Sequence, residues 1–411
     1  MKQSGNKKKS GAKGKLVKPS YAANIKVVGV GGGGCSAVSR MRDTLDLKGV
    51  DFIAINTDAQ DLDYCNAKRR IYIGKNLTKG LGTGMNPELG RQSAEETRAE
   101  IVEALKGADL VFITTGLGGG TGSGASPVVA EAAREAGALT VAVITKPFAF
   151  EGVQRARIAT DALAKLKEKV DTYIVIPNDR IFSIISKDTP IVKAFEVIDN
   201  VLKSAISSIA ELIAMHGLVN VDFADVKATM QNTGGAVVTV GYASGQERAV
   251  NAVNDAINSP LLETSIEGAR SVLLGISGGR DLKMNEINDI AKVIGGAIDQ
   301  NARITFGAYH DKKLKAGQVK VTLIATNFNG AGVTKGIDAP SPSLFASTVP
   351  ETKIDRAATP QAALASAKLS DRDAKDDGKK DADKSGAAVK KKTSEIWDIP
   401  TFLRRNRRGD S

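Results

Sequence analysis

The stretch ITTGLGGGTGSGASPVV, residues 113–129, holds six glycines between a β-branched run and an alanine-rich segment. Glycine loses more backbone freedom on folding than any other residue, so such a cluster needs a reason. It could be a flexible linker, a packing device or a cradle of backbone amides for phosphate groups. Because a strand-like run at 109–115 precedes it and a helical pattern at 126–136 follows it, a linker fits poorly.

A second glycine loop, GVGGGGCSAV at residues 29–38, follows the strand-like run IKVVGV. Its glycines match G-x-G-x-x-G, which is typical of a tight turn that brings backbone amides and a helix N-terminus to a phosphate. In a parallel sheet both loops would emerge at the carboxyl edge of the strands, where ligands bind. Two such loops, with the hydroxyls of Thr121 and Ser123, suit a di- or triphosphate better than a dinucleotide. Neither loop contains the P-loop motif G-x-x-x-x-G-K-S/T.

Strand-like runs alternate with helical patterns in the first half of the chain. Several runs are continuous and β-branched, which indicates strands buried on both faces, as in a parallel sheet. We therefore expect a doubly wound α/β domain at residues 21–189, one long helix at 190–217 and a second, α+β domain at 218–330. The first domain should have strands at 25–30, 51–56, 70–74, 109–115, 139–145 and 172–177 and helices at 35–46, 91–106, 126–136 and 154–169. The second should have strands at 236–243, 269–277, 303–310 and 319–327.

The ends of the chain differ in composition from this core. Residues 1–20 are a basic arm and residues 331–394 are rich in alanine and charge, so both are expected to be disordered. Residues 395–411 contain the chain's single tryptophan and form a separate peptide. The formal net charge of +11 arises in these segments, because residues 19–330 hold equal numbers of acidic and basic residues. We therefore expect the core not to bind nucleic acid.

Composition also argues against two other classes of protein. No apolar run approaches the length of about 18 residues that a membrane span requires, and no signal peptide is evident. The two cysteines, Cys35 and Cys65, are too few for a disulfide framework. We expect them to be reduced thiols.

The segment GGGTGSG at 118–124 resembles the glycine signature of the tubulin and FtsZ GTPase family. Along the whole chain, seven further motifs resemble those of the FtsZ family and occur in the same order. They are IKVVGVGGGG, FIAINTDAQ, GLGTGMNPELG, KPFAFEG, VIPNDRI, NVDFADVKATM and DIPTFLRR. The resemblance covers about residues 24–327 and the C-terminus. It implies a tubulin/FtsZ-like fold, with a Rossmann-like parallel-sheet GTPase domain, a long central helix, a second α+β domain and disordered tails. It also implies a polymerising GTPase of bacterial cell division.

Carried over residue by residue, the resemblance predicts a binding site for GTP or GDP. Backbone amides of both glycine loops would meet the phosphates, and Mg²⁺ would be held mainly through the phosphates. The loop GLGTGMNPE would contact the γ-phosphate, and the segment FEGVQR the ribose and a nearby phosphate. The predicted binding residues are Gly32, Gly33, Gly34, Ser36, Asp58, Thr83, Gly84, Asn86, Gly118, Gly119, Gly120, Thr121, Gly122, Glu151, Arg155, Asn178, Phe195 and Asp199.

Guanine recognition requires an acceptor for N1–H and N2–H₂, which a carboxylate supplies in bidentate fashion. Asp199 fits this role on the long helix, one turn after Phe195. The two residues share a helix face, so Phe195 could stack on the base, and Asn178 could add a second polar contact.

Simpler interpretations remain open for several of these residues. Asp58 could form an Asx-turn, Asn86 an ordinary turn before Pro87, and Phe195 could belong to the core. Glu151 and Arg155 are spaced as an exposed helical ion pair.

Asp222 and Asp225 follow the long helix, and one of them could cap the next helix. The 23 residues between Asp199 and Asp222 span up to about 35 Å, so these carboxylates could not reach their own nucleotide. They could reach that of a second subunit stacked head to tail, and a contact that does not close on itself builds a filament. By the resemblance, Asp222 and Asp225 position the attacking water on the neighbouring subunit's GTP, with Asn220 assisting.

The C-terminal peptide contains a candidate binding segment for partner proteins. Ile399, Phe402, Leu403 and Arg404 in DIPTFLRR resemble the FtsZ segment that binds division proteins and membrane tethers, and the arginines could also contact anionic lipid. The resemblance implies a cytoplasmic location at the mid-cell division ring, on the inner face of the membrane. The pair Cys35-Ser36 stands where FtsZ proteins usually have asparagines.

Two other functions are alternatives to a polymerising GTPase. A non-hydrolysing tubulin-like scaffold would lack the acidic pair, which is present. An NAD-binding Rossmann dehydrogenase would have one glycine loop rather than two, and no hydride-transfer site is evident.

Overall fold

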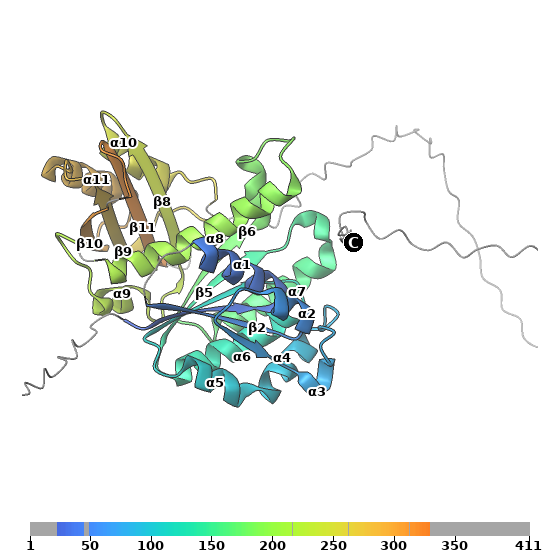
Figure 1. Cartoon of the computed structure of the whole chain (residues 1–411). Helices are drawn as coiled ribbons and strands as arrows, with labels where there is room; N and C mark the ends of the chain where they lie inside the picture. Colours follow the sequence, from blue (N-terminus) through green and yellow to red (C-terminus); the bar gives the residue numbers. More distant parts are fainter. Residues whose placement is uncertain (1–22, 45–48, 216, 262, 312, 329–411) are drawn as a thin grey trace, which may run out of the picture. The chain divides into compact units, whose positions relative to one another are not determined.

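The computed structural model describes residues 23–44, 49–215, 217–261, 263–311 and 313–328, all of which belong to one compact unit (Figure 1). The arm predicted at 1–20, the linker at 331–394 and the peptide at 395–411 lie outside the described residues. None of the helices in the described part of the chain has the length and apolarity that a membrane crossing requires.

The first part of the described chain forms a seven-stranded sheet in the order β3-β2-β1-β4-β5-β6-β7. Every pairing in it is parallel, which confirms the doubly wound fold. The central strands β1, β4 and β5 are almost completely buried, which explains their apolar, β-branched sequences, whereas β3 at the edge carries exposed arginines. The strands are β1 (Ile25–Val30), β2 (Val50–Asn56), β3 (Arg69–Tyr72), β4 (Leu110–Gly116), β5 (Leu139–Lys146), β6 (Thr172–Pro177) and β7 (Gly234–Gly235).

Helices cover both faces of this sheet (Figure 1). Strand residues on one face of the sheet, such as Val27, pack with residues of α1 and α8. Strand residues on the other face, such as Val28, pack with residues of α5, α6 and α7. The helices are α1 (Gly31–Thr44), α2 (Ala59–Tyr64), α3 (Lys75–Thr78), α4 (Pro87–Glu96), α5 (Arg98–Leu105), α6 (Thr121–Glu135) and α7 (Val153–Lys167), with short 3-10 turns η1 (Ala149–Glu151) and η2 (Asn178–Ser183).

Two helix predictions differ from the structure. The helix expected at 91–106 is two helices, α4 and α5, which are separated at Thr97, where the backbone leaves the helical region. The helices after the glycine loops begin at Gly31 and Thr121, several residues earlier than the apolar pattern predicted. The loops themselves form the first helical turns, a feature that apolar periodicity does not register.

The long helix α8 (Ile191–Ala214) has 24 residues and lies between two sheets. Its apolar residues share one core with Phe112 of the first sheet and with Leu273 and Ile324 of the second. The second sheet has the order β10-β9-β11-β8 and is mixed, because β9 and β10 are parallel and β11 is antiparallel to both its neighbours. Its elements are β8 (Val237–Ser244), β9 (Ala269–Gly278), β10 (Arg303–His310) and β11 (Gln318–Phe328), with α9 (Phe223–Met230), α10 (Arg248–Ile257) and α11 (Met284–Ala297).

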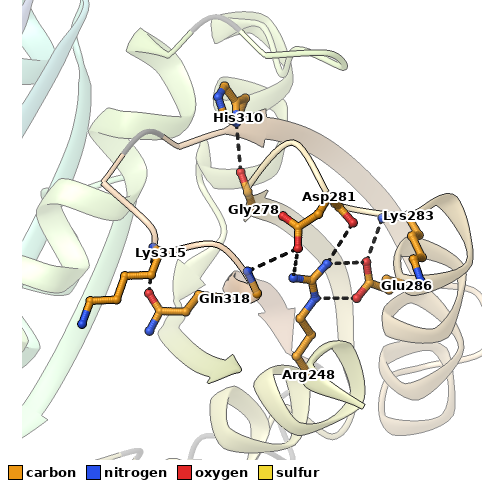
Figure 2. Close-up of polar contacts among 9 residues, drawn as sticks. Arg248, Gly278, Asp281, Lys283, Glu286, His310, Lys315 and Gln318 are labelled. Carbon is orange, nitrogen blue, oxygen red and sulfur yellow. Dashed lines mark hydrogen bonds and ion pairs between the residues drawn. The ribbon is translucent and has the colours of Figure 1, made fainter. Parts of the chain in front are cut away.

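One buried arginine joins the helices of the second domain (Figure 2). The guanidinium of Arg248 on α10 lies between two carboxylates, with Nη1 2.5 Å from Asp281 Oδ2 and Nε 2.6 Å from Glu286 Oε1. Asp281 also accepts from the backbone N–H of Gly317. Such a bidentate arrangement fixes α10 against α11 and the loop before it.

Candidate nucleotide site

The two glycine loops meet at the carboxyl edge of the first sheet, after the adjacent strands β1 and β4. A Cβ atom added at Gly31 would lie 2.8 Å from the backbone nitrogen of Gly122, and one at Gly33 would lie 3.6 Å from the Cα atom of Gly116. Gly31 also has φ +72°, which favours glycine. Glycine is therefore required at Gly31, where the loops touch, whereas the distance at Gly33 is an ordinary van der Waals contact. Packing is one of the two roles of the glycine loops.

Other glycines divide between packing and open space. A Cβ atom at Gly120 would lie 2.7 Å from the nitrogen of Asn86, and one at Gly34 would collide with the carbonyl oxygen of Thr114. By contrast, Gly32 is exposed, and nothing lies within 4 Å of the Cβ position at Gly119. The open positions lie at or beside the N-termini of α1 and α6, whose first amides have no partner within their helix. These ends are suited to bind phosphate.

The hydroxyls of the second loop hold the loops together. Thr121 Oγ1 lies 2.6 Å from Thr57 Oγ1 and 3.2 Å from Thr83 Oγ1, and all three residues are buried. Ser123 Oγ accepts from the backbone N–H of Gly118 at 3.0 Å. The sequence predicts that the Gly118 amide and the hydroxyls of Thr121 and Ser123 face phosphate. In this structure Gly118 bonds Ser123 within the loop, and Thr121 bonds threonines of two other loops that converge on it.

Asp58 and Asn86 both act as helix caps. Asp58 Oδ1 accepts from the N–H of Asp61 at the start of α2, and Asn86 Oδ1 accepts from the N–H groups of Glu88 and Leu89 at the start of α4. Asp58 is thus a helix N-cap rather than an Asx-turn, and Asn86 is the N-cap of α4 rather than part of an ordinary turn, while their contacts with the nucleotide stay predictions. The caps fix the loops that lead into the site. Asp58 uses only Oδ1 for its cap, so Oδ2 is not needed for the capping bond.

Asp61 is a site residue that the sequence analysis missed. Its Oδ2 lies 3.0 Å from the Cβ position of Gly32, and its carboxylate accepts from Asn56 Nδ2 at 2.8 Å. Burial, and secondarily the charge of Asp58, raise the pKa of Asp61. Among the described residues no three potential ligands gather into a metal cluster. Two carboxylates beside the phosphate loop fit a hard cation that is held mainly by phosphates.

An aromatic cluster lies at the other end of the edge. Phe195 on α8 meets Phe148 edge-on at 6.0 Å between ring centroids, and Phe148 also contacts Phe150 at 4.8 Å and Phe182 at 5.6 Å. Phe195 is 43% exposed, so the interpretation of Phe195 as a core residue is wrong. Its ring is held by the cluster and still presents a face to solvent.

Asp199 and Asn178 place acceptors near this cluster. Asn178 Oδ1 is buried and has no hydrogen-bond partner among the described residues, which is unusual unless a ligand supplies the donor. Asp199 Oδ2 lies 2.6 Å from Nη2 of Arg40, a partner that the sequence analysis missed. Sequence offers no signal for Arg40, because the contact depends on how α1 crosses α8.

Glu151 and Arg155 form an ion pair, but not within one helix, because Glu151 ends η1 and Arg155 lies on α7 after Gly152, whose φ is +98°. Glu151 also accepts from the backbone N–H of Phe148 at 2.8 Å. The pair therefore supports the aromatic cluster, and a contact with ribose or phosphate stays a prediction, as it does for Thr83 and Gly84.

The thiol of Cys35 points into the core, where it donates to the carbonyls of Gly29 and Ile55. Cys35 and Cys65 are both free thiols. A change from asparagine to Cys35 therefore alters the core of the loop rather than its open face. Ser36 is half-buried.

The predicted catalytic residues lie in the loop after α8. Asp222 caps α9 by accepting from the N–H of Asp225 at 2.7 Å, and Asn220 Oδ1 accepts from the N–H of Gly217 at 2.6 Å. Asp225 Oδ1 lies 3.5 Å from Nη2 of Arg303. Asn220 and Asp222 are nevertheless exposed, so the capping role leaves the Asp222 carboxylate open to a partner.

Tyr309 positions this acidic loop, and the sequence analysis did not identify it. Its buried hydroxyl donates to the carbonyl of Leu212 at 3.0 Å and accepts from the N–H of Val221 at 3.4 Å. Beside it, the N–H of Ala308 donates to the carbonyl of Val219. The end of α8 and the acidic loop are thus tied to one strand.

Comparison with known proteins identifies the family to which this chain belongs. Residues 24–186 match the Tubulin/FtsZ family GTPase domain, and residues 234–329 match the FtsZ family C-terminal domain. FtsZ of M. jannaschii, solved as an empty dimer, is 45% identical over 74% of this chain and 88% of its own, with a TM-score of 0.69. CetZ2 of Haloferax volcanii is 21% identical over 74% of this chain and 92% of its own, with a TM-score of 0.64, and shares the fold. The chain belongs to the Tubulin/FtsZ family and is a tubulin-like cytoskeletal GTPase that binds GTP and GDP.

Proposed function

We propose that this GTPase assembles head to tail into filaments of the cell-division ring and hydrolyses GTP at the contact between subunits. The nucleotide lies on the glycine loops of one subunit. Asp222 and Asp225 of the next subunit position the attacking water, with Asn220 assisting.

The observation that carries this proposal is the separation of the two halves of the site. Asp199 lies in the third turn of α8 and Asp222 lies beyond its end, and the helix rises about 22 Å from Asp199 to Ala214. The acidic loop therefore cannot act on the nucleotide of its own subunit. The solved M. jannaschii relative is a dimer, which agrees with a site completed by a second copy.

Exposed apolar side chains at both ends of α8 support a contact between subunits. Leu81, Phe150 and Val153 lie around the glycine loops and the aromatic cluster and are 85%, 70% and 86% exposed. Leu218, beside the acidic loop, is 83% exposed. Exposed apolar side chains at two different places on one molecule suit a repeating head-to-tail contact.

Within the subunit, the chain's own groups bind and orient the nucleotide. The open amides at the N-termini of α1 and α6 would hold the phosphates, where fixed dipoles stabilise developing charge. Phe195 would stack on guanine, and Asp199 and Asn178 would accept from the base. Mg²⁺, when bound, would neutralise phosphate charge, with Asp58 and Asp61 on its protein side.

The C-terminal peptide would connect the filament with the membrane and with other division proteins. The protein would lie in the cytoplasm, at the mid-cell ring on the inner face of the membrane. Ile399, Phe402, Leu403 and Arg404 would bind division proteins and membrane tethers, and the neighbouring arginines would add a weak contact with anionic lipid.

A mixing experiment tests the shared site. Asp222→Asn removes the charge but keeps a good N-cap, whereas alanine would also cost about 1 kcal/mol of helix stability. Asp199→Ala disables the base site of the other half. Each variant alone should lose most GTP turnover, and a mixture should regain part of it, since some contacts pair an intact nucleotide site with an intact acidic loop.

The control is Asp289→Ala, which removes an exposed carboxylate on α11 and should leave turnover unchanged. A mixture that stays as inactive as its two components would overturn the shared site.

A further inference from the structure

The ionisation state of the Asp199 carboxylate determines which base it can bind by hydrogen bonds. The guanidinium of Arg40 lies against this carboxylate and favours its ionised form. We propose that Arg40 is a positioning residue for base specificity: its guanidinium keeps Asp199 ionised and therefore selective for guanine over adenine. This inference rests on the proposed role of Asp199 in binding the base.

Arg40 lies on the helix that begins in the first glycine loop and pairs with the proposed base-binding residue Asp199. Arg40 lies on α1, the helix that begins at Gly31 in the first phosphate loop, and its Nη2 is 2.6 Å from Oδ2 of Asp199 on α8. The Asp199 side chain is 14% exposed and that of Arg40 is 49% exposed. A single rigid helix therefore links the phosphate loop to the carboxylate at the base end.

Burial would otherwise neutralise this carboxylate. Desolvation raises the pKa of Asp199, the guanidinium of Arg40 lowers it, and the negative charge of Glu196 raises it further. Glu196 is itself paired with Lys193 at 2.9 Å. Removal of Arg40 leaves burial and a like charge, and both favour the protonated acid.

Other elements that pack against α8 contribute little charge at this point. From η2 come Asp179, which accepts from the N–H of Ala149, and Arg180, and neither is among the charges that act on Asp199. From β5 comes Lys146, which is paired with Glu263 at 2.5 Å, and β8 carries only the titratable Tyr242. Among the described residues, the positive charge that acts on Asp199 is that of Arg40.

The protonation state of Asp199 reverses its hydrogen-bond pattern. An ionised carboxylate offers two acceptors, which match the N1–H and N2–H₂ donors of guanine. A neutral carboxylic acid offers one donor and one acceptor, which match the N1 acceptor and N6–H₂ donor of adenine. Loss of Arg40 should therefore weaken GTP binding and relax discrimination against ATP, and both effects should grow as pH falls.

Equilibrium binding of GTP and of ATP, measured from pH 5.5 to 8 at protein concentrations below assembly, tests this inference. For Arg40→Met we expect a loss of GTP affinity that is modest at pH 8 and roughly tenfold or more at pH 5.5, with a smaller GTP/ATP ratio. Arg40→Lys keeps a positive charge and should restore most of the wild-type pH profile. Arg42→Met, on the same helix but contacting Asn66, is the matched control and should bind as wild type does.

A parallel profile, in which Arg40→Met lowers GTP affinity equally at every pH, would overturn the inference and leave Arg40 a purely structural role. Arg40→Gln gives a second neutral variant if Arg40→Met does not fold. Asp199→Asn separates this failure from that of the proposed function: if Asp199→Asn binds GTP as wild type does, Asp199 does not read the base at all.

Discussion

Single residues in this protein often have a structural use and a functional one at the same place. Asp58, Asn86 and Asp222 cap helices, and these caps fix the loops that carry the site. Gly120 and Gly122 are required by close packing, while the open glycines beside them offer amides to phosphate. The local interpretation of such a residue therefore does not exclude the functional one.

The proposed contact of Phe195 with the base can be tested by a single substitution. The exposed ring of Phe195 should stack on guanine, and stacking of a base on an aromatic ring contributes about 1–3 kcal/mol. We expect Phe195→Leu to weaken GTP binding by roughly tenfold or more, since leucine keeps apolar contact without the ring, as measured by equilibrium binding. The control is Tyr242→Leu, which removes an exposed aromatic ring from β8 of the second domain. Equal affinity of Phe195→Leu and wild type would place the base elsewhere.

Among the elements, α8 and β10 together decide where the acidic loop lies. The loop follows directly from α8, and β10 holds it through the main-chain contact of Val219 with Ala308 and the hydroxyl of Tyr309. A change in the position of α8 would therefore be passed to the loop through Tyr309.

Tyr309→Phe tests this link because it removes one hydroxyl and keeps the ring. The carbonyl of Leu212 and the N–H of Val221 would lose a partner, at a cost of about 1–3 kcal/mol in the free energy of unfolding. We expect GTP turnover in the assembled state to fall several-fold, while GTP binding to the monomer is unchanged, because the nucleotide lies at the other end of α8. Turnover equal to wild type at saturating protein would show that the hydroxyl serves stability alone.

For the whole molecule, the proposed shared site would make GTP turnover depend on assembly, because α8 separates the nucleotide site from the acidic loop. One subunit holds both proposed half-sites, but about 22 Å of α8 separates Asp199 from the end of the helix where the acidic loop begins, so an isolated subunit would lack a complete site.

We accordingly expect GTP turnover per subunit to be low in dilute protein and to rise steeply above a threshold concentration, measured as phosphate release over a dilution series. Asp222→Asn should assemble but stay slow at every concentration. A specific activity that is constant on dilution would contradict the shared site.

Sequence patterns by themselves determined most of the first domain, because buried parallel strands and strand–glycine–helix junctions leave local signals. They located β1, β4 and both glycine loops, and the spacing of Asp199 from Asp222 already placed the two carboxylates at opposite ends of one helix. Contacts between distant segments were decided only by the tertiary structure. Arg40 meets Asp199 because α1 crosses α8, Tyr309 meets Leu212 because β10 lies beside the end of that helix, and Thr57, Thr83 and Thr121 meet because three loops converge. Such pairings depend on packing geometry, and no local periodicity encodes which side chains from separate elements will face each other.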